Sequence, residues 1–334
     1  PERRFVEYGL FVSYFPLLVA GPIERATHLL PQIQKPRIFN SKYVISGINL
    51  VLWGYFKKVA IADNISPSVD EIFNNYSNYS PAVILLGAFL FSIQIYCDFS
   101  GYSDIARGVS RFFGLELLLN FNFPYFSKSI PEFWKKWHIS LSSWFRDYLY
   151  IPLGGSRVSK LMGIRNVFII FLVSGFWHGA NWTFIIWGLF HALMFLPSFI
   201  VRSEKTELNS AASNPILQIG NILLTFVLVT IGWVIFRANN LTHAFEYFKA
   251  MFNFESGKIG FSSFLNPYDN QSLGVEFLNI LALIIIEISI VKKAHNWLER
   301  VSPNWMLILQ GCIVAYIIIN VPINKALSFI YFQF

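Results

Sequence analysis

The chain has 334 residues, of which 54% are hydrophobic and 18% aromatic, while only 13% are charged. This charged share is about half of that in soluble domains, which excludes an ordinary soluble globular protein. The formal net charge of +7 comes from cations in short segments between apolar runs rather than in one patch. Such cations are typical of topology signals and lipid headgroup contacts, and they argue against nucleic-acid binding.

Uncharged apolar runs recur along the chain, and several are long enough to cross a bilayer core as a helix, which takes about 20 residues. They predict an all-α, polytopic membrane helical bundle forming a single domain over residues 1–334. The predicted spans are Phe5–Ala20, Ala82–Cys97, a hairpin within Asn166–Val201, Ile216–Phe236, Phe277–Val291 and Met306–Val321. The run Tyr43–Phe56 stops after 14 residues at Lys57 and Lys58, so it is expected to be short, tilted or buried in protein.

Residues 97–163 are too polar to face lipid tails and too aromatic for ordinary solvent loops. They predict short helices that line a cavity or lie at the membrane interface. Ser129–Glu132 is a capping-box pattern with Pro131 in the first turn, so one helix is expected to start there and to run to Pro152. Its aromatic stripe has helical spacing and is typical of an interfacial amphipathic helix; the stripe consists of Trp134, Trp137, Leu141, Trp144 and Tyr148.

The 36 residues of Asn166–Val201 contain no Asp, Glu, Lys or Arg and have basic residues on either side. They are slightly few for two full crossings, and the flanking cations favour placing both ends in the cytoplasm. We therefore expect a helical hairpin with one short limb, which would place His178 at membrane depth, reachable only through a water-filled cavity. The residues that mark the tip are Gly175, Gly179 and Asn181.

His178 is open to two interpretations. An imidazole in a low-dielectric site loses some of its tendency to charge and is then available as a base. A lone membrane histidine is equally well explained by a hydrogen bond to a neighbouring backbone group. His191 lies 13 residues further on, about 220° around a helix, so it does not share the face of His178 and is expected to pack within the bundle. No HxxxH or HExxH spacing occurs, so no metal site is predicted.

Several charged side chains lie within or beside apolar segments. Asp104 and Arg107 are three residues apart, which favours an ion pair across one helical turn. Asp98 ends an apolar run and could equally cap the following helix. Glu287 stands alone within LALIIIEISIV, where a carboxylate is costly in lipid, so it is expected to face another helix.

Two segments taken together resemble the signature blocks of the membrane-bound O-acyltransferase family: EFWKKWHISLSSWFRDYLYIPLGGSR at 132–157 and FWHGANWTFIIWGLFHA at 176–192. The segments QIYCDFSGYSDIARG at 94–108 and NFNFPYFSKSI at 120–130 resemble the blocks that precede them. Similarity to the alginate O-acetyltransferase branch in particular lies in AGPIERATHLLPQI at 20–33 and FRANNLTHAFEYFKAMF at 236–252. Members usually carry more N-terminal spans, and this chain starts at Pro1 rather than Met, so we expect it to lack its natural N-terminal spans.

The resemblance implies a helical enzyme with a tunnel through the bilayer, lined by short re-entrant and interfacial helices. The WHG histidine of the family matches His178, which would be the catalytic residue. The WHISLS histidine matches His138, a second catalytic or substrate-positioning residue. The C-terminal FIYFQF resembles endings in this branch, so Tyr331 is either part of an aromatic anchor or an acyl relay. Residues expected to contact substrate or line the tunnel are Asp98, Ser142, Arg146, Trp177 and Asn181.

The same resemblance implies an O-acetyltransferase of the cytoplasmic (inner) membrane that serves an exported or cell-surface polysaccharide. Acetyl-CoA or another acyl thioester is the expected donor, no cofactor is expected, and an extracytoplasmic esterase-like transferase is the expected protein partner. Three alternatives stay open: D-alanyl transfer to teichoic acid from a carrier-protein thioester, action on peptidoglycan, and a transporter. Transporters share broken helices and polar groups at membrane depth.

Overall fold

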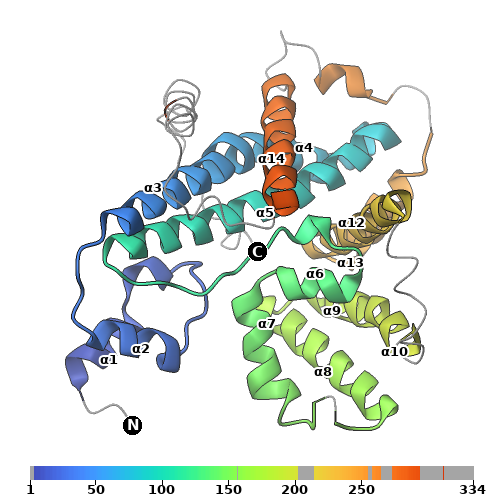
Figure 1. The fold of residues 1–334 in the computed structure, drawn as a ribbon. Coiled ribbons are helices and arrows are strands. Elements are labelled where there is room, and N and C mark those ends of the chain that lie inside the picture. The colour runs from blue at the N-terminus through green and yellow to red at the C-terminus, as the bar shows by residue number, and fades with distance from the viewer. Residues whose placement is uncertain are drawn as a thin grey trace. The chain divides into compact units, whose positions relative to one another are not determined.

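The computed structural model describes residues 4–155, 157–201, 214–254, 258–264, 273–293 and 311. Over these residues the regular elements are helices, and six of them are long and apolar enough to cross a membrane (Figure 1). The prediction of an all-α polytopic membrane protein is therefore confirmed. The predicted span Met306–Val321 and Tyr331 lie outside the described residues.

The candidate spans include most of the long helices. They are Ser41–Asn74, which joins α3 (Ser41–Tyr55), the π-helical segment η2 (Phe56–Ala62) and α4 (Asp63–Asn74), then α5 (Pro81–Phe112), α8 (Lys160–His178), α9 (Trp182–Phe195) with its extension to Phe199, α12 (Pro215–Arg237) and α14 (Gly274–Lys293). The shorter helices are α1 (Phe5–Val12), α2 (Ala26–Gln34), α6 (Ile130–Lys136), α7 (Ile139–Phe145), the π-helical η5 (Arg146–Tyr150), α10 (Pro197–Val201) and α13 (Leu241–Ala250).

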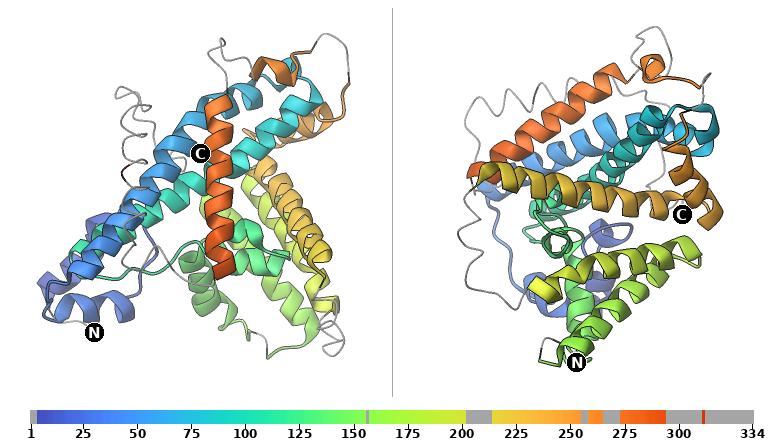
Figure 2. Two further views of the ribbon diagram at one scale, coloured as in Figure 1. Left: turned by 45° about the horizontal axis from the view of Figure 1, so that its top comes forward. Right: turned by 90° about the vertical axis from the view of Figure 1, so that its right-hand side faces the viewer.

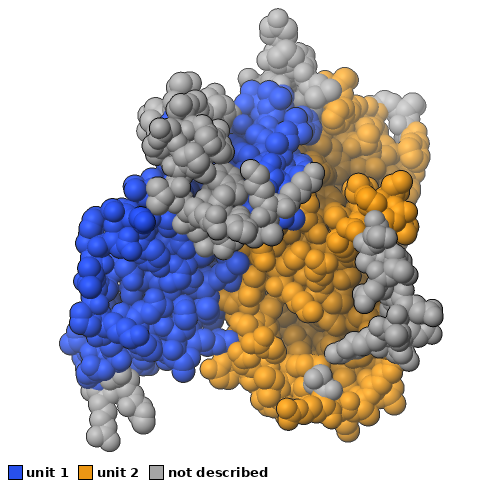
Figure 3. Space-filling view, viewed as in Figure 1, with its two compact units in different colours: residues 1–67, 93–120, 264–333 blue, residues 68–92, 121–263, 334 orange. Residues whose placement is uncertain are grey.

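The chain divides into two compact units, coloured separately in Figure 3. Unit 1 consists of Pro1–Pro67, Ile93–Asn120 and Phe264–Gln333, and unit 2 of Ser68–Ser92, Phe121–Ser263 and Phe334. The boundaries fall within α4 and within α5, so each of these helices contributes to both units. The single domain expected over the whole chain stays a prediction.

The first long span of unit 1 runs past the two lysines at which the sequence predicted an end. The helix continues from α3 through η2 into α4, because both ammonium groups are neutralised by carboxylates. Lys57 Nζ lies 2.5 Å from Asp104 Oδ2, and Lys58 Nζ lies 2.6 Å from Asp98 Oδ1. Paired charges of this kind are tolerated inside a bundle where isolated ones are not.

Two further predictions for charged residues are wrong. Asp104 pairs with Lys57 and not with Arg107, whose guanidinium instead contacts Glu116 at 2.9 Å. Asp98 caps no helix, because α5 continues without a break from Pro81 to Phe112. Glu287 does face another helix, as predicted: its Oε1 accepts a hydrogen bond from the Tyr96 hydroxyl at 2.6 Å.

Helices α3 and α5 lie side by side in unit 1 (Figure 2) and touch through glycines at two levels. A Cβ atom on Gly54 would come within 2.5 Å of the Gly101 carbonyl oxygen, and one on Gly47 within 2.7 Å of the Gly108 oxygen. Small residues at such crossings let two backbones approach closely, which is how helices associate in membranes. The same approach carries Lys57 and Lys58 to their carboxylate partners on α5.

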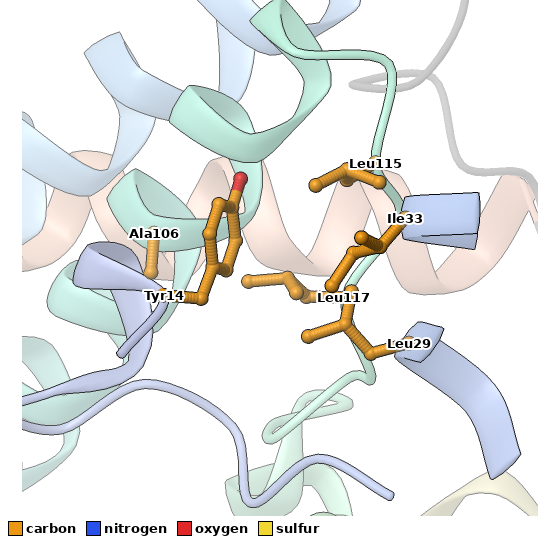
Figure 4. Close-up of a cluster of buried hydrophobic side chains, with 6 residues drawn as sticks. All are labelled: Tyr14, Leu29, Ile33, Ala106, Leu115 and Leu117. Carbon is orange, nitrogen blue, oxygen red and sulfur yellow. The ribbon is translucent and has the colours of Figure 1, made fainter. Parts of the chain in front are cut away.

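The predicted span Phe5–Ala20 is wrong. Helix α1 ends at Val12, and a short 3₁₀ turn with Pro16 follows; proline has no N–H to donate to the carbonyl four residues earlier, which here is that of Val12. The segment after α1 instead supplies Tyr14 to a small apolar cluster of unit 1 (Figure 4). Its buried members are Tyr14, Leu29, Ile33, Ala106, Leu115 and Leu117.

The predicted hairpin is present in unit 2, where α8 and α9 run side by side (Figure 1). Its limbs span 19 and 18 residues, so the expectation of one short limb is wrong: the helix begins at Lys160, ahead of the uncharged run. A Cβ atom on Gly175 would lie 2.3 Å from the Phe184 oxygen, and one on Gly188 equally close to the Phe171 oxygen. The limbs therefore pack as tightly as glycine allows.

The helix predicted from Ser129 to Pro152 starts as expected but is interrupted. The Ser129 hydroxyl caps α6 by accepting from the Glu132 N–H at 3.3 Å, which confirms the helix start, while the Glu132 carboxylate accepts from the Lys128 N–H instead of that of Ser129. The helix then ends at Lys136, and α7 begins at Ile139. Between them stands His138, so the break in the predicted helix falls at a candidate catalytic residue.

Candidate active site

His138 has an unusual backbone conformation. Its φ of 44° and ψ of 54° are left-handed, which for a residue other than glycine costs about 1–3 kcal/mol and is found mostly where the surroundings enforce it. Ser142, one turn along α7, bonds both residues at this break in the helix. Its N–H donates to the His138 carbonyl at 2.9 Å, and its hydroxyl donates to the Trp137 carbonyl at 3.3 Å. Ser142 thus bonds the backbone on which the buried His138 ring is carried.

His178 is the last residue of α8 and is half-buried. Gly179, with a φ of 153°, ends the helix, and a Cβ atom there would lie 2.9 Å from the Phe184 ring. The imidazole meets Trp187 and Phe236 edge to face at centroid distances of 5.2 and 5.1 Å. Aromatic rings therefore fix the position of this imidazole at the turn between α8 and α9.

Unit 2 brings His138 and His178 to the same place. The Trp177 ring lies 6.4 Å from the His138 ring and 5.0 Å from the His178 ring. Burial, and secondly the charge that His178 would carry, lower the pKa of His138 from 6.5 to about 3. His138 is accordingly a neutral imidazole at physiological pH, able to donate one N–H but not to act as an imidazolium.

Three other predicted site residues, Trp177, Asn181 and Arg146, also lie in unit 2. Trp177 is half-exposed between the two histidines. The Asn181 side chain caps α9 by accepting from the Thr183 N–H at 3.1 Å, and donates to the Asn239 carbonyl at 2.8 Å. Arg146 is exposed, and its guanidinium pairs with the neighbouring Asp147 at 2.8 Å. These placements do not test a role in lining a tunnel, which stays a prediction.

Asp98 belongs to unit 1, where it is buried and forms the ion pair with Lys58. The sequence reasoning did not identify Lys57 and Lys58 as interior residues, because it treated them as a flank. The signal that could have found them is the acidic pair at Asp98 and Asp104, which needed cations from another helix. Among the described residues, no group of three or more His, Cys, Asp or Glu side chains is placed to hold a metal ion.

His191 is fully buried in unit 2, packed between Trp134 and Trp187 at centroid distances of 4.9 and 5.2 Å. Within the part of the chain that the structure describes, neither of its ring nitrogens has a hydrogen-bond partner. The prediction that His191 packs within the bundle is confirmed. Its neighbour Trp187 also touches His178, so the two histidines of the hairpin share one indole.

Comparison with known proteins gives a consistent result. The profile of the membrane-bound O-acyltransferase family matches residues 3–237, a range that includes both His138 and His178. The chain is 35% identical to the peptidoglycan O-acetyltransferase of Helicobacter pylori over 99% of its own length and 65% of that protein. It is 40% identical to the probable alginate O-acetylase AlgI of Azotobacter vinelandii, over 88% of its own length and 56% of the relative.

A more distant similarity is to the teichoic acid D-alanyltransferase of Bacillus subtilis. The identity is 29%, over 70% of this chain and 61% of that protein. The chain thus spans 56–65% of the length of these curated relatives.

Proposed function

Because the chain belongs to the membrane-bound O-acyltransferase family, we propose that it passes an acetyl or similar short acyl group from a cytoplasmic thioester across the membrane for O-acylation of an exported or cell-surface polysaccharide. The observation that carries this proposal is the meeting of His138 and His178 around Trp177. The two histidines come from separate sequence blocks, and a strained backbone positions one of them. We take the acetyl group and the class of acceptor from the relatives, a peptidoglycan O-acetyltransferase and a probable alginate O-acetylase.

The chemistry follows from two neutral imidazoles. His178 removes the proton of the acceptor hydroxyl as its oxygen attacks the thioester carbonyl, a form of base assistance that contributes about 10²–10⁴ in rate. The N–H of neutral His138 donates to the carbonyl oxygen as it becomes negative. The carbon–sulfur bond then breaks, and the proton held by His178 passes to the leaving thiolate. The products are an ester and a free thiol, so no net proton is consumed.

The aromatic surroundings of His178 favour this sequence of steps. Trp187 and Phe236 hold the ring at a fixed orientation, which lowers the entropic cost of proton transfer. Apolar walls also limit bulk water, and water would otherwise hydrolyse the acyl group. We propose acetyl-CoA or another acyl thioester as donor, with no further cofactor, an extracytoplasmic esterase-like protein as partner and the cytoplasmic membrane as the location.

A second candidate is D-alanyl transfer to teichoic acid from a carrier-protein thioester. The 29% identity to the Bacillus subtilis D-alanyltransferase favours it. The same two histidines would serve, because both reactions attack a thioester with a hydroxyl. The higher identity to the O-acetyltransferases, 35 and 40%, makes acetyl transfer the leading proposal.

The test is the variant His178→Gln in the full-length protein, expressed at matched level in a native host that lacks its own copy. We expect polymer-linked acetyl to fall by about 10²–10⁴, the range for loss of a general base. His28→Gln is a matched control, since His28 lies in unit 1 and contacts Glu24; it should retain acetylation. Full acetylation by His178→Gln would contradict the proposal. If the wild-type protein gives polymer-linked D-alanine instead of acetyl, the second candidate is favoured.

A further inference from the structure

The turn that follows His178 is attached to a second turn, between α12 and α13. Asn181 donates from its side-chain nitrogen to the Asn239 carbonyl at 2.8 Å. Asn239 in turn donates its backbone N–H to Nδ1 of His243 at 3.2 Å. A continuous line of hydrogen bonds therefore joins His243 on α13 to the residue three positions after His178.

The bonds of His243 determine its tautomer. Since Nδ1 accepts from a backbone N–H, the ring proton must lie on Nε2, and Nε2 is 2.9 Å from the carbonyl oxygen of Phe73. His243 thus accepts on one side and donates on the other. The ring also stacks on Tyr76 at a centroid distance of 5.4 Å, which limits its rotation. All of these residues belong to unit 2.

The remaining contacts of α13 make it a rigid support. Tyr247, one turn after His243, donates from its hydroxyl to the Ile84 carbonyl at 2.8 Å and stacks on Phe73 at a centroid distance of 4.4 Å. At the end of α12, Arg237 pairs with Asp70 at 2.6 Å. The α12–α13 turn is therefore held against the end of α4 at several points, and of these only His243 also bonds Asn239.

We propose that His243 is a positioning residue for the acyl-transfer reaction, acting on His178 through Asn239 and Asn181. This inference rests on the proposed function of His178. The physical reason is that Gly179 and Ala180 give the turn after α8 little stiffness of its own, so the bond from Asn181 adds to the ring contacts of His178 in holding the end of α8. An error of about 1 Å in the position of a reacting group costs up to about 10² in rate.

Two substitutions separate the two bonds of His243. His243→Asn places an amide oxygen near the position of Nδ1, so it keeps an acceptor for Asn239 but cannot reach Phe73. His243→Gln places its amide near the position of Nε2, so it keeps a donor for Phe73 and loses the acceptor. Asn181→Ser keeps a cap for the Thr183 N–H but is too short to reach Asn239. Tyr247→Phe is the matched control, because it removes another bond of α13 outside this line.

The measurement is transfer of radiolabelled acetyl from acetyl-CoA to polymer in membranes of the native host carrying each full-length variant, with protein level and melting temperature recorded. We expect kcat to fall about 10-fold or more in His243→Gln and in Asn181→Ser, with KM for acetyl-CoA within about two-fold, because a misplaced base slows the chemical step and not donor binding. His243→Asn should retain most of the activity. Tyr247→Phe should lower the melting temperature and leave kcat unchanged.

The double variant Asn181→Ser/His243→Gln should be no slower than the slower single variant, since both break one line of contacts. Equal kcat in His243→Gln and His243→Asn would overturn the positioning role, as would losses that simply add in the double variant. If the wild type transfers no acetyl from acetyl-CoA, the proposed donor or function fails. If the wild type is active and His243→Gln matches it, only the positioning role fails.

Discussion

In unit 1 the lysines and aspartates within the spans are paired with opposite charges, whereas in unit 2 the functional candidates are imidazoles packed among aromatic rings. Lys57 and Lys58 each meet a carboxylate within 2.6 Å. His178 and His191 instead meet indole and phenyl rings at centroid distances near 5 Å. The first arrangement pairs opposite charges in the interior, and the second surrounds imidazoles with apolar rings.

The contrast indicates what each unit contributes. A buried ion pair adds little net stability, but breaking it leaves one charge unpaired at high cost, so it constrains which helix packs against which. An imidazole surrounded by apolar rings adds no such constraint, and it retains a lone pair for chemistry. We infer that unit 1 fixes the register of α3 against α5, while unit 2 provides the reacting groups.

The largest effect is expected when one charge is removed from unit 1. Lys58→Met leaves Asp98 and Asp63 without the cation that both contact, at 2.6 and 2.7 Å. Loss of one partner of a buried pair costs about 3–5 kcal/mol, so we expect a large fall in the melting temperature of the purified protein. The double variant Lys58→Met/Asp98→Asn should recover part of this loss. A single variant as stable as the wild type would show that the pair does not constrain the fold.

The ion pairs of Lys57 and Lys58 are also features of the fold that the sequence did not predict. Hydrophobic run length predicted the ends of α12 to within one residue and those of α14 to within three, and the capping pattern at Ser129 predicted the start of α6. Lys57 was misread because a cation beside an apolar run is usually a flank, and its partner Asp104 lies 47 residues away. A partner at such a distance is created by tertiary packing and leaves no local signal.

The candidate active site likewise has features that the local sequence did not predict. The aromatic spacing at 134–148 favoured one continuous helix, whereas His138 adopts a left-handed conformation that interrupts it. The roles of His138 and His178 came from resemblance to known blocks, and periodicity alone left the purpose of His178 open. The line from His243 to Asn181 joins residues 62 positions apart through backbone groups, which carry no residue-type signal.

A milder test compares a buried polar residue of unit 2 with Lys58. His191→Leu replaces an imidazole that has no hydrogen-bond partner among the described residues by an apolar side chain of similar volume. Because no bond is lost, we expect the free energy of unfolding to change by less than about 1.5 kcal/mol, as for volume-conserving exchanges in cores. The melting temperature in the same detergent checks this. A loss as large as that of Lys58→Met would mean that His191 holds a polar partner in the folded protein.

The smallest expected effect concerns pH: the pH at which acetyl-transfer activity falls should not shift. Burial holds the pKa of His138 at about 3, below its ordinary value of 6.5, so the neutral form persists from pH 8 down to well below pH 5. His138→Gln should lower the acetyl-transfer rate, because the amide donates from a different position, yet leave the pH at which activity falls unchanged. Rates measured from pH 5 to 8 with saturating acetyl-CoA for both proteins decide this. A displaced acid limb in His138→Gln would show that His138 titrates during turnover, and the contrast between the ion pairs of unit 1 and the candidate histidines of unit 2 would then not extend to the catalytic cycle.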